Sequence, residues 1–185
     1  MESTGAKGLK LGDACPTFEL PGVDRSTRNL KSYDAIRVLV IGFTCNHCPY
    51  VQAWEDRIME LQRTFASQGM QIVCINSNET QNYPQDSFDH MVERARERWF
   101  NYHYLRDEDQ AVAKAFGAEC TPEFFVFDQQ RKLRYRGRLD DDHEHPDKVT
   151  KRYLRDAIET LLAGKQPTTP TTHAMGCSIK WEKAA

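Results

Sequence analysis

The sequence lacks several features that would place the chain in a specialised class. It has no apolar run near the length of about 20 residues that crosses a bilayer, and the longest ones, such as 38–43, are far shorter. It also has no basic block, and its charge is nearly balanced, with 25 Lys and Arg residues against 27 Asp and Glu residues. This balance argues against a nucleic acid or an anionic membrane surface as a partner, and we expect neither.

The first residues carry scattered charges and no apolar segment of the kind found in a secretory signal peptide. We therefore expect a cytoplasmic protein. No internal repeat is present, and a content of 39% hydrophobic residues argues against a disordered chain. A chain of 185 residues suits one domain with a core of its own.

Six cysteines are present, at positions 15, 45, 48, 74, 120 and 177. Irregular spacing in a chain of this length favours a catalytic or metal-binding pair over a disulfide framework. Only Cys45 and Cys48 stand close together, so their C-x-x-C segment is the chemical focus of the sequence.

Strand and helix patterns alternate along the chain. The apolar run 36–43 predicts a buried central strand, and apolar residues at steps of three and four predict a helix after the C-x-x-C segment, ended by Gly69. The run 70–75 predicts the next buried strand. The same patterns predict a hairpin over 18–30, a helix over 88–99, a short strand over 103–105, a short helix over 109–116, a hairpin over 123–138 and a last helix that begins at Pro146.

This order predicts an α/β fold with a mixed central sheet sandwiched by helices and an N-terminal hairpin extension. We expect three segments along the chain. Residues 1–15 form a loose N-terminal segment, 16–163 form the domain, and 164–185 form a C-terminal tail rich in Thr and Pro near its start.

The C-x-x-C segment lies between a predicted strand and a predicted helix. The free N–H groups and the positive dipole end of a helix N-terminus favour a thiolate. We expect Cys45 to lie there as an exposed nucleophile and Cys48, more buried, to act as the resolving thiol in disulfide exchange. His47 can be positively charged near neutral pH, so we expect it to lower the pKa of Cys45 and to make the disulfide more oxidising.

A zinc site is the main alternative interpretation of one C-x-x-C pair. Zinc usually needs a second pair of ligands, and the sequence has no second C-x-x-C and no H-x-x-x-H. His143 and His145 belong to a charged segment that reads as a loop before the last helix. We therefore expect no metal. A module that holds a metal or senses redox state, without turnover of its own, stays an alternative.

The segment Phe43–Pro49, the later Cys120–Phe125 with its Thr-Pro pair, and the order of elements resemble the thioredoxin fold. More narrowly, the chain resembles the peroxiredoxin-like, thioredoxin-domain group of the alkyl hydroperoxide reductase/thiol-specific antioxidant superfamily. The resemblance covers about residues 10–163, and the ending 176–181 is also typical of the group. It implies a redox-active disulfide without a bound cofactor, a protein or small-molecule thiol or disulfide as substrate, and an upstream thiol reductant.

In that fold, the proline of the Thr-Pro pair is cis and lies against the disulfide. The resemblance therefore implies a cis Thr121–Pro122 bond, with the backbone of Thr121 free to pair with an incoming peptide strand. We also expect Thr44, Asn46 and Pro49 to belong to the substrate groove.

Two departures from related families bear on the activity. Thioredoxin itself has Trp before its first cysteine and Gly-Pro between the two, whereas this chain has Thr44 and the pair Asn-His. Peroxiredoxins carry Pro and Thr upstream of a peroxidatic cysteine that would align with Cys48, and here Ile41 and Cys45 take those places. We therefore expect a thiol–disulfide oxidoreductase, with a thiol-dependent peroxidase as the alternative.

The other cysteines have different expected roles. Cys74 lies in a predicted buried strand and is expected to be an inert core thiol, and Cys15 to be a loop thiol without a role. Cys120 precedes the Thr-Pro pair, and an auxiliary redox role is one hypothesis for it.

Cys177 is a second candidate for an auxiliary redox role. It follows a Thr/Pro-rich linker of the extended kind, which is long enough to reach the cysteine pair. Ile179 and Trp181 are expected to dock the tail. A packed tail with an unreactive thiol is the alternative.

Overall fold

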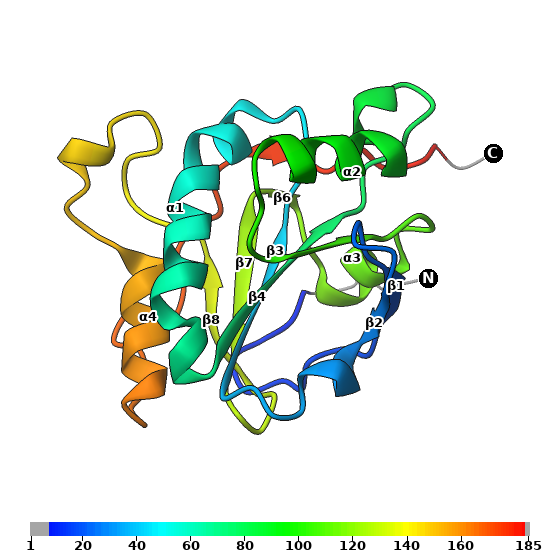
Figure 1. Cartoon of the computed structure of the whole chain (residues 1–185). Coiled ribbons are helices and arrows are strands. Elements are labelled where there is room, and N and C mark those ends of the chain that lie inside the picture. Colours follow the sequence, from blue (N-terminus) through cyan, green and yellow to red (C-terminus); the bar gives the residue numbers. More distant parts are fainter. Residues whose placement is uncertain (1–7, 184–185) are drawn as a thin grey trace, which may run out of the picture.

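The computed structural model describes residues 8–183. Its centre is a five-stranded sheet in the order β5–β4–β3–β7–β8 (Figure 1). These strands are β3 (Val38–Phe43), β4 (Met70–Asn76), β5 (His103–Arg106), β7 (Glu123–Phe127) and β8 (Leu133–Gly137). β3, β4 and β5 are parallel to one another, whereas β7 is antiparallel to both β3 and β8. The predicted mixed sheet is confirmed.

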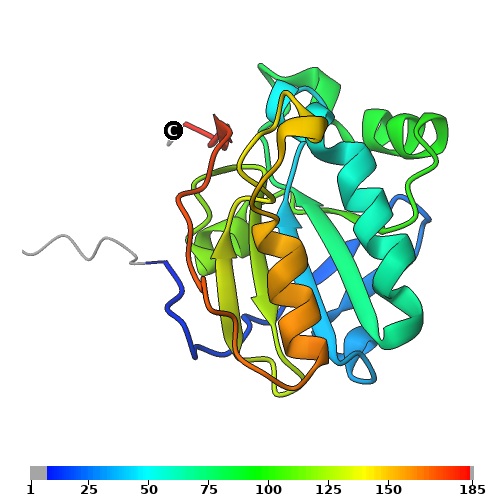
Figure 2. The ribbon, with the colours of Figure 1, turned by 90° about the vertical axis from the view of Figure 1, so that its left-hand side faces the viewer.

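Helices cover both faces of the sheet, as Figures 1 and 2 show. One face carries α1 (Pro49–Phe65), α2 (Phe88–Glu97) and α4 (Tyr153–Leu162). The other face carries α3 (Ala111–Phe116) and the antiparallel hairpin of β1 (Glu19–Pro21) and β2 (Thr27–Asn29). The predicted sandwich with an N-terminal hairpin is therefore confirmed.

Two short strands outside the central sheet form a ladder of their own. β6 (Cys120–Thr121) pairs antiparallel with β9 (Cys177–Ser178). Four single turns complete the fold: η1 (Leu30–Tyr33), η2 (Ala66–Gln68), η3 (Pro84–Asp86) and η4 (Pro146–Lys148). Within residues 8–183, no helix is both long and apolar enough to cross a bilayer.

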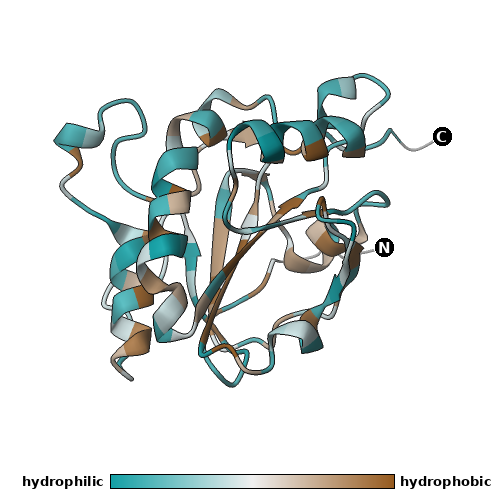
Figure 3. Ribbon diagram, in the orientation of Figure 1, coloured by the Kyte–Doolittle hydropathy of each residue, from teal (hydrophilic) through white to brown (hydrophobic). Residues whose placement is uncertain are grey.

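Side chains that alternate along each strand divide the core into two layers. In β3, Val38 and Val40 pack in the layer under α1 and α4, whereas Leu39 and Ile41 pack in the layer under α3. Every residue of β3 is buried, which accounts for its unbroken apolar run. Figure 3 shows the same division, with apolar strands inside and polar outer surfaces on the helices.

The expectation of a loose N-terminal segment is wrong for residues 8–15. The Leu9 N–H donates to the carbonyl of Phe116 at 3.2 Å, and the Gly12 N–H donates to that of Leu133 at 2.8 Å. These bonds tie the segment to α3 and β8. Residues 1–7, which belong to the same expectation, lie outside the described residues.

Two helix boundaries also differ from the predictions. Pro146 opens only the single turn η4, because Val149 leaves the helical region with ψ of 120°, and α4 begins at Tyr153. Helix α2 ends at Glu97, so Trp99, expected on its buried face, is 85% exposed and has φ of +56°.

Candidate active site

Cys45 and Cys48 lie just after the carboxyl end of β3, where the chain turns into α1. Helix α1 begins at Pro49 with Cys48 as its N-cap, so the expectation that the helix opens at Cys45 is wrong. Proline suits the first helical position because its missing N–H would have no partner there in any case. The positive end of the helix therefore acts on Cys48 more directly than on Cys45.

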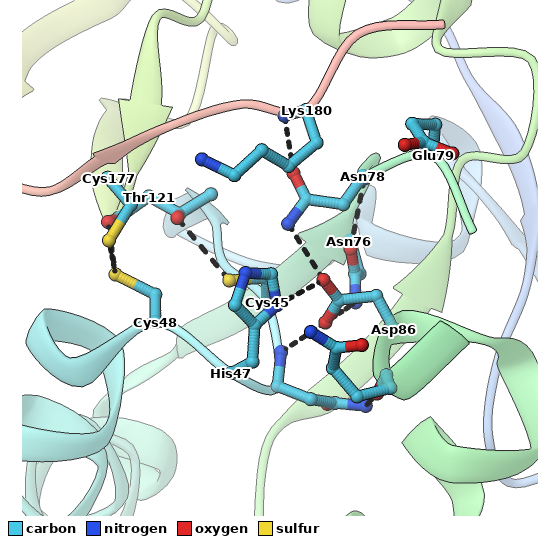
Figure 4. Close-up of polar contacts among 12 residues, drawn as sticks. Cys45, His47, Cys48, Asn76, Asn78, Glu79, Asp86, Thr121, Cys177 and Lys180 are labelled. Atoms are coloured by element: carbon cyan, nitrogen blue, oxygen red, sulfur yellow. Dashed lines mark hydrogen bonds and ion pairs between the residues drawn. The ribbon is translucent and has the colours of Figure 1, made fainter. Parts of the chain in front are cut away.

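Both side chains of the pair are buried, since Cys45 is 2% exposed and Cys48 is 0% exposed. The expectation of an exposed Cys45 sulfur is wrong, because Thr121 and the C-terminal tail cover the pair (Figure 4). The Cys45 thiol lies 3.4 Å from the Thr121 hydroxyl, and the Cys48 thiol lies 3.1 Å from the Thr121 carbonyl oxygen. The Thr121–Pro122 peptide bond is cis. Thr121 thus contacts both sulfur atoms.

The pKa values of the two thiols shift in opposite directions. The pKa of Cys48 is lowered mainly by its interaction with the Cys45 thiol, and further by Cys177 and by the Val51 N–H. The pKa of Cys45 is raised because it keeps the shared proton, because it is buried and because Asp86 lies nearby. When two ionisable groups share a proton, the pKa of one falls and the pKa of the other rises. The thiolate is therefore more stable on Cys48.

The imidazole of His47 pairs with a carboxylate, although it was expected to act on Cys45 directly. Its Nδ1 lies 2.6 Å from Asp86 Oδ2, and its ring stacks on Tyr83 with the ring centres 5.4 Å apart. The negative charge of Asp86 is one of the causes that raise the pKa of Cys45. A protonated His47 would offset that charge, so its influence on the cysteine is indirect.

Asp86 is a site residue that the sequence reasoning missed. Its carboxylate is fully buried and accepts hydrogen bonds from the Asn46 N–H at 2.7 Å and from the side chains of Asn76 at 3.2 Å and Asn78 at 2.8 Å. One signal was available in the sequence: Asn76 ends and Asn78 follows a buried strand, β4, which lies parallel to β3. Polar residues at the carboxyl ends of neighbouring parallel strands meet at one edge of a sheet.

One group of side chains within the described residues has the composition of a metal site. Cys45, His47 and Asp86 each offer a ligand atom, and these atoms lie within 4.8 Å of one another. Sulfur, nitrogen and oxygen ligands suit zinc, but a structural zinc site has four of them. Both oxygens of Asp86 already accept hydrogen bonds from asparagine groups. The arrangement fits a charge network better than a closed metal site.

The C-terminal tail reaches the cysteine pair. In the ladder of β6 and β9, Cys177 stands opposite Thr121, and Ser178 stands opposite Cys120. The backbone of Thr121, which was expected to be free for a peptide, is therefore occupied by the tail. Cys177 Sγ lies 2.9 Å from Cys48 Sγ (Figure 4), and all six cysteines are free thiols.

The remaining predicted groove residues do not line one open surface. Thr44 and Asn46 are buried, and the Asn46 side chain donates to the Gln85 carbonyl at 2.7 Å, whereas Pro49 is exposed on the first turn of α1. The half-buried Cys120 has its thiol 4.0 Å from the Pro122 carbonyl, and among the described residues it makes no hydrogen bond to another cysteine.

The two remaining cysteines are core residues. Cys74 is fully buried in β4, and burial raises the pKa of its thiol, as expected for an inert core cysteine. Cys15 is also buried, and burial raises the pKa of its thiol to about 12. Neither thiol contacts the pair.

Comparisons with known proteins place the chain in a family. The AhpC/TSA family matches residues 11–136. The crystal structure of an uncharacterized conserved protein from Geobacillus kaustophilus is similar to this chain, with 38% sequence identity and a TM-score of 0.89. The match covers 95% of this chain and 94% of the Geobacillus chain. The crystal structure of a hypothetical protein from Sinorhizobium meliloti 1021 is also similar, with 33% sequence identity and a TM-score of 0.91. That match covers 96% of this chain and 98% of the Sinorhizobium chain.

A more distant structure shows the fold alone. A thiol:disulfide interchange protein of the thioredoxin family from Chlorobium tepidum is 18% identical, with a TM-score of 0.58, and covers 70% of this chain and 87% of its own. None of the curated proteins compared with the chain matches it. Because the family match spans more than half of the chain, the protein belongs to the AhpC/TSA family, has a thioredoxin-like fold and carries a thiol-based redox function.

Proposed function

We propose that the protein is a thiol–disulfide oxidoreductase whose redox-active pair is Cys45 and Cys48. The observation that carries the proposal is the position of both sulfur atoms against one residue, Thr121, beside the cis bond to Pro122. The two thiols also influence each other's ionisation, as expected for neighbours that act as a pair. Such a dithiol carries the redox chemistry without a bound cofactor.

Cys48 is the thiol that starts the exchange. Its thiolate is stabilised at the N-terminus of α1 and by Cys45, so it attacks one sulfur of a disulfide substrate. A mixed disulfide forms at Cys48, and the first substrate thiol leaves. This assignment reverses the roles expected from the sequence, in which Cys45 attacks and Cys48 resolves.

Cys45 completes the reaction. After loss of its proton, its sulfur attacks Cys48 Sγ, so that the Cys45–Cys48 disulfide forms and the second substrate thiol leaves. We assign His47 as the group that accepts the proton of Cys45, because a ring nitrogen of His47 lies within 4.8 Å of the Cys45 sulfur. The substrate is reduced and the pair is oxidised, and an upstream thiol reductant restores the dithiol by the reverse steps.

Trapping of the mixed disulfide tests this assignment. The variants are made in a Cys177→Ser background, because Cys177 contacts Cys48. With glutathione disulfide, Cys45→Ser should accumulate an adduct at Cys48, whereas Cys48→Ser should react more slowly at Cys45. Cys74→Ser, in the core, is the matched control and should behave like the background protein.

Two other outcomes are informative. A faster adduct at Cys45 would return the nucleophile to that residue. If no variant formed an adduct and the intact pair formed no disulfide, the proposed oxidoreductase function would be wrong.

A thiol-dependent peroxidase is the second candidate function. Family membership favours it, together with the stabilised thiolate of Cys48 at a helix N-terminus. Against it stand Cys45 and Ile41, which occupy the places of the threonine and proline that a peroxidatic site carries. We therefore expect slow consumption of peroxide with a thiol donor. Rapid consumption that survives Cys45→Ser and is lost in Cys48→Ser would establish the peroxidase instead.

A further inference from the structure

The tail occupies the place at which a peptide would add to β6. An extended peptide binds to a strand edge through main-chain hydrogen bonds, with its side chains placed by the register. Here β9 takes that edge, and the register sets Cys177 opposite Thr121. Cys177 Sγ then meets Cys48 Sγ at 2.9 Å. The tail thus presents its cysteine to the site as a peptide substrate would.

A glycine permits this close approach. A Cβ at Gly176 would come within 2.0 Å of the Thr121 carbonyl oxygen and 2.5 Å of its carbonyl carbon. Both are rigid backbone atoms, so a larger residue at this position would push the tail away from β6. Gly176 therefore sets how closely Cys177 approaches Cys48.

The chain beyond Cys177 is held as well. Ile179 is 3% exposed and packs in the core layer of α3. The Lys180 N–H donates to Asn78 Oδ1 at 2.9 Å, and the Lys180 carbonyl accepts from the Glu79 N–H at 2.8 Å. The expectation that Ile179 docks the tail is confirmed, whereas Trp181 is 40% exposed.

These contacts join the tail to the polar network of the site (Figure 4). Asn78 accepts from the Lys180 N–H and donates to Asp86 at 2.8 Å. Asp86 in turn pairs with His47. The tail is therefore held after Cys177 by Asn78, and before it Gly176 leaves room for the close approach to Thr121.

We propose that Cys177 is a third redox thiol and that a Cys48–Cys177 disulfide closes the peptide groove with the chain's own tail. This inference rests on the proposed function of the Cys45–Cys48 pair. Once that disulfide has formed, the Cys177 thiolate attacks Cys48 Sγ. The Cys45–Cys48 bond breaks, the Cys48–Cys177 bond forms, and Cys45 takes up a proton in place of the one that Cys177 lost.

This exchange needs no oxidant beyond the disulfide substrate, because the number of disulfides in the chain does not change. In the resulting state, β9 is covalently joined to Cys48 at the start of α1, which keeps it paired with β6 and closes Thr121 to peptides. A thiol reductant that cleaves the Cys48–Cys177 bond restores the free-thiol state, in which only noncovalent contacts hold the tail on β6 and a peptide can compete with it. The redox state of Cys48 thereby controls how firmly the tail is held over the groove.

Disulfide mapping after mild oxidation tests the inference. Each full-length protein is treated with glutathione disulfide, alkylated in acid to stop exchange, and digested. Cys45→Ser should give a Cys48–Cys177 disulfide, and the unaltered protein should give the same linkage with Cys45 alkylated. Cys177→Ser should give only the Cys45–Cys48 disulfide. Cys120→Ser is the matched control and should leave the linkages of the unaltered protein in place.

The two proposals fail separately. If Cys45→Ser kept glutathione on Cys48 while Cys177 stayed alkylatable, the third redox thiol would be excluded, whatever the activity of the protein. If Cys177→Ser formed no Cys45–Cys48 disulfide, the proposed oxidoreductase pair would be wrong instead.

A second variant tests whether the position of Cys177, and not only its intrinsic reactivity, determines the rate of disulfide formation. In a Cys45→Ser background, Gly176→Val should slow formation of the Cys48–Cys177 disulfide by about tenfold or more, because misplacement by an ångström disrupts alignment of reacting atoms. In the unaltered background, the same variant should still form the Cys45–Cys48 disulfide. Ser178→Ala, at an exposed neighbour, is the control. An unchanged rate in Gly176→Val would show that the β6–β9 ladder does not position Cys177.

Discussion

His47 and Asp86 form a close pair inside the redox site, with Nδ1 of the imidazole 2.6 Å from Oδ2 of the buried carboxylate. Asp86 opposes ionisation of Cys45, and the imidazole offsets Asp86 when it is protonated. The histidine of the C-x-x-C segment thus acts on the sulfur through a neighbouring charge. This relationship makes its effect on redox potential depend on Asp86.

We predict that His47→Ala lowers the reduction potential of the Cys45–Cys48 disulfide. Without the imidazole, the charge of Asp86 is less compensated, so the thiolates of the reduced form are less stable. A shift of about 30 mV, equal to tenfold in the exchange equilibrium, is the expected order of magnitude. Titration against glutathione measures it, with the exposed His173→Ala as the control. A potential that stays the same or rises would contradict this electrostatic role.

The disulfide itself should be more oxidising than that of thioredoxin, whose potential is about −270 mV. The physical reason is the lowered pKa of Cys48, which stabilises the reduced form. The measurement uses Cys177→Ser, so that only the Cys45–Cys48 pair titrates. A potential at or below that of thioredoxin would show that the site does not favour the dithiol.

The reaction of Cys48 with a disulfide reagent should depend little on pH near neutrality. Interactions with Cys45, Cys177 and the Val51 N–H lower its pKa well below that of an ordinary thiol, so its ionisation should persist at neutral pH and be lost only in acid. An ordinary thiol, with a pKa of about 8.5, loses about tenfold in reactivity for each pH unit below that value.

Stopped-flow measurement on Cys177→Ser and peptide mapping follow this reaction. Cys120 supplies an internal comparison, because burial and nearby glutamates raise its pKa to about 12, and its reactivity should rise steeply with pH. A steep dependence at Cys48 as well would argue against a stabilised thiolate there.

A separate prediction concerns the ion pair under α2. The Glu55 side chain is only 2% exposed and accepts hydrogen bonds from Nε and Nη2 of Arg94, both at 2.8 Å. Arg94→Ala would leave this carboxylate with Arg98, whose Nε lies 3.3 Å away. We expect the free energy of unfolding to fall by about 2–4 kcal/mol.

The matched control for this prediction is Arg96→Ala, an exposed position on the same helix. It should change the free energy of unfolding by less than about 0.5 kcal/mol. Denaturant titration followed by fluorescence gives both values. Similar losses in the two variants would indicate that helix propensity, and not the buried pair, accounts for the effect.

The inner strands β3 and β4 could be predicted closely because they are almost entirely apolar. The predicted strand 70–75 and β4 (Met70–Asn76) differ by one residue. Helix starts were harder to predict, because a proline at the first turn begins a long helix in one place and only a single turn in another. Pro49 opens a long helix, whereas Pro146 opens a single turn, and the backbone of Val149 decides the difference. That backbone depends on tertiary contacts that the local sequence does not carry.

Part of the site was visible in the sequence for a physical reason. Cysteines three apart between a strand and a helix indicate exchange chemistry, and the Thr-Pro pair pointed to the residue that meets both sulfurs. The asparagines after the second buried strand hinted at a polar site, but not at Asp86 itself, because a polar loop usually faces solvent and the burial of Asp86 depends on how the loop folds over the sheet edge. The register of β9 on β6 was equally hidden, since a two-residue strand carries no periodic pattern.

The path of the tail has a consequence for how copies of the chain meet. Before it reaches β6, the tail runs beside β8, where the Thr172 N–H donates to the Arg136 carbonyl at 3.0 Å (Figure 2). β8 is an outer strand of the central sheet, and uncovered strand edges promote pairing between molecules. The last residues therefore shield two edges in succession. A molecule that released its tail would expose both, and its own sheet would become a template for a strand of a second copy.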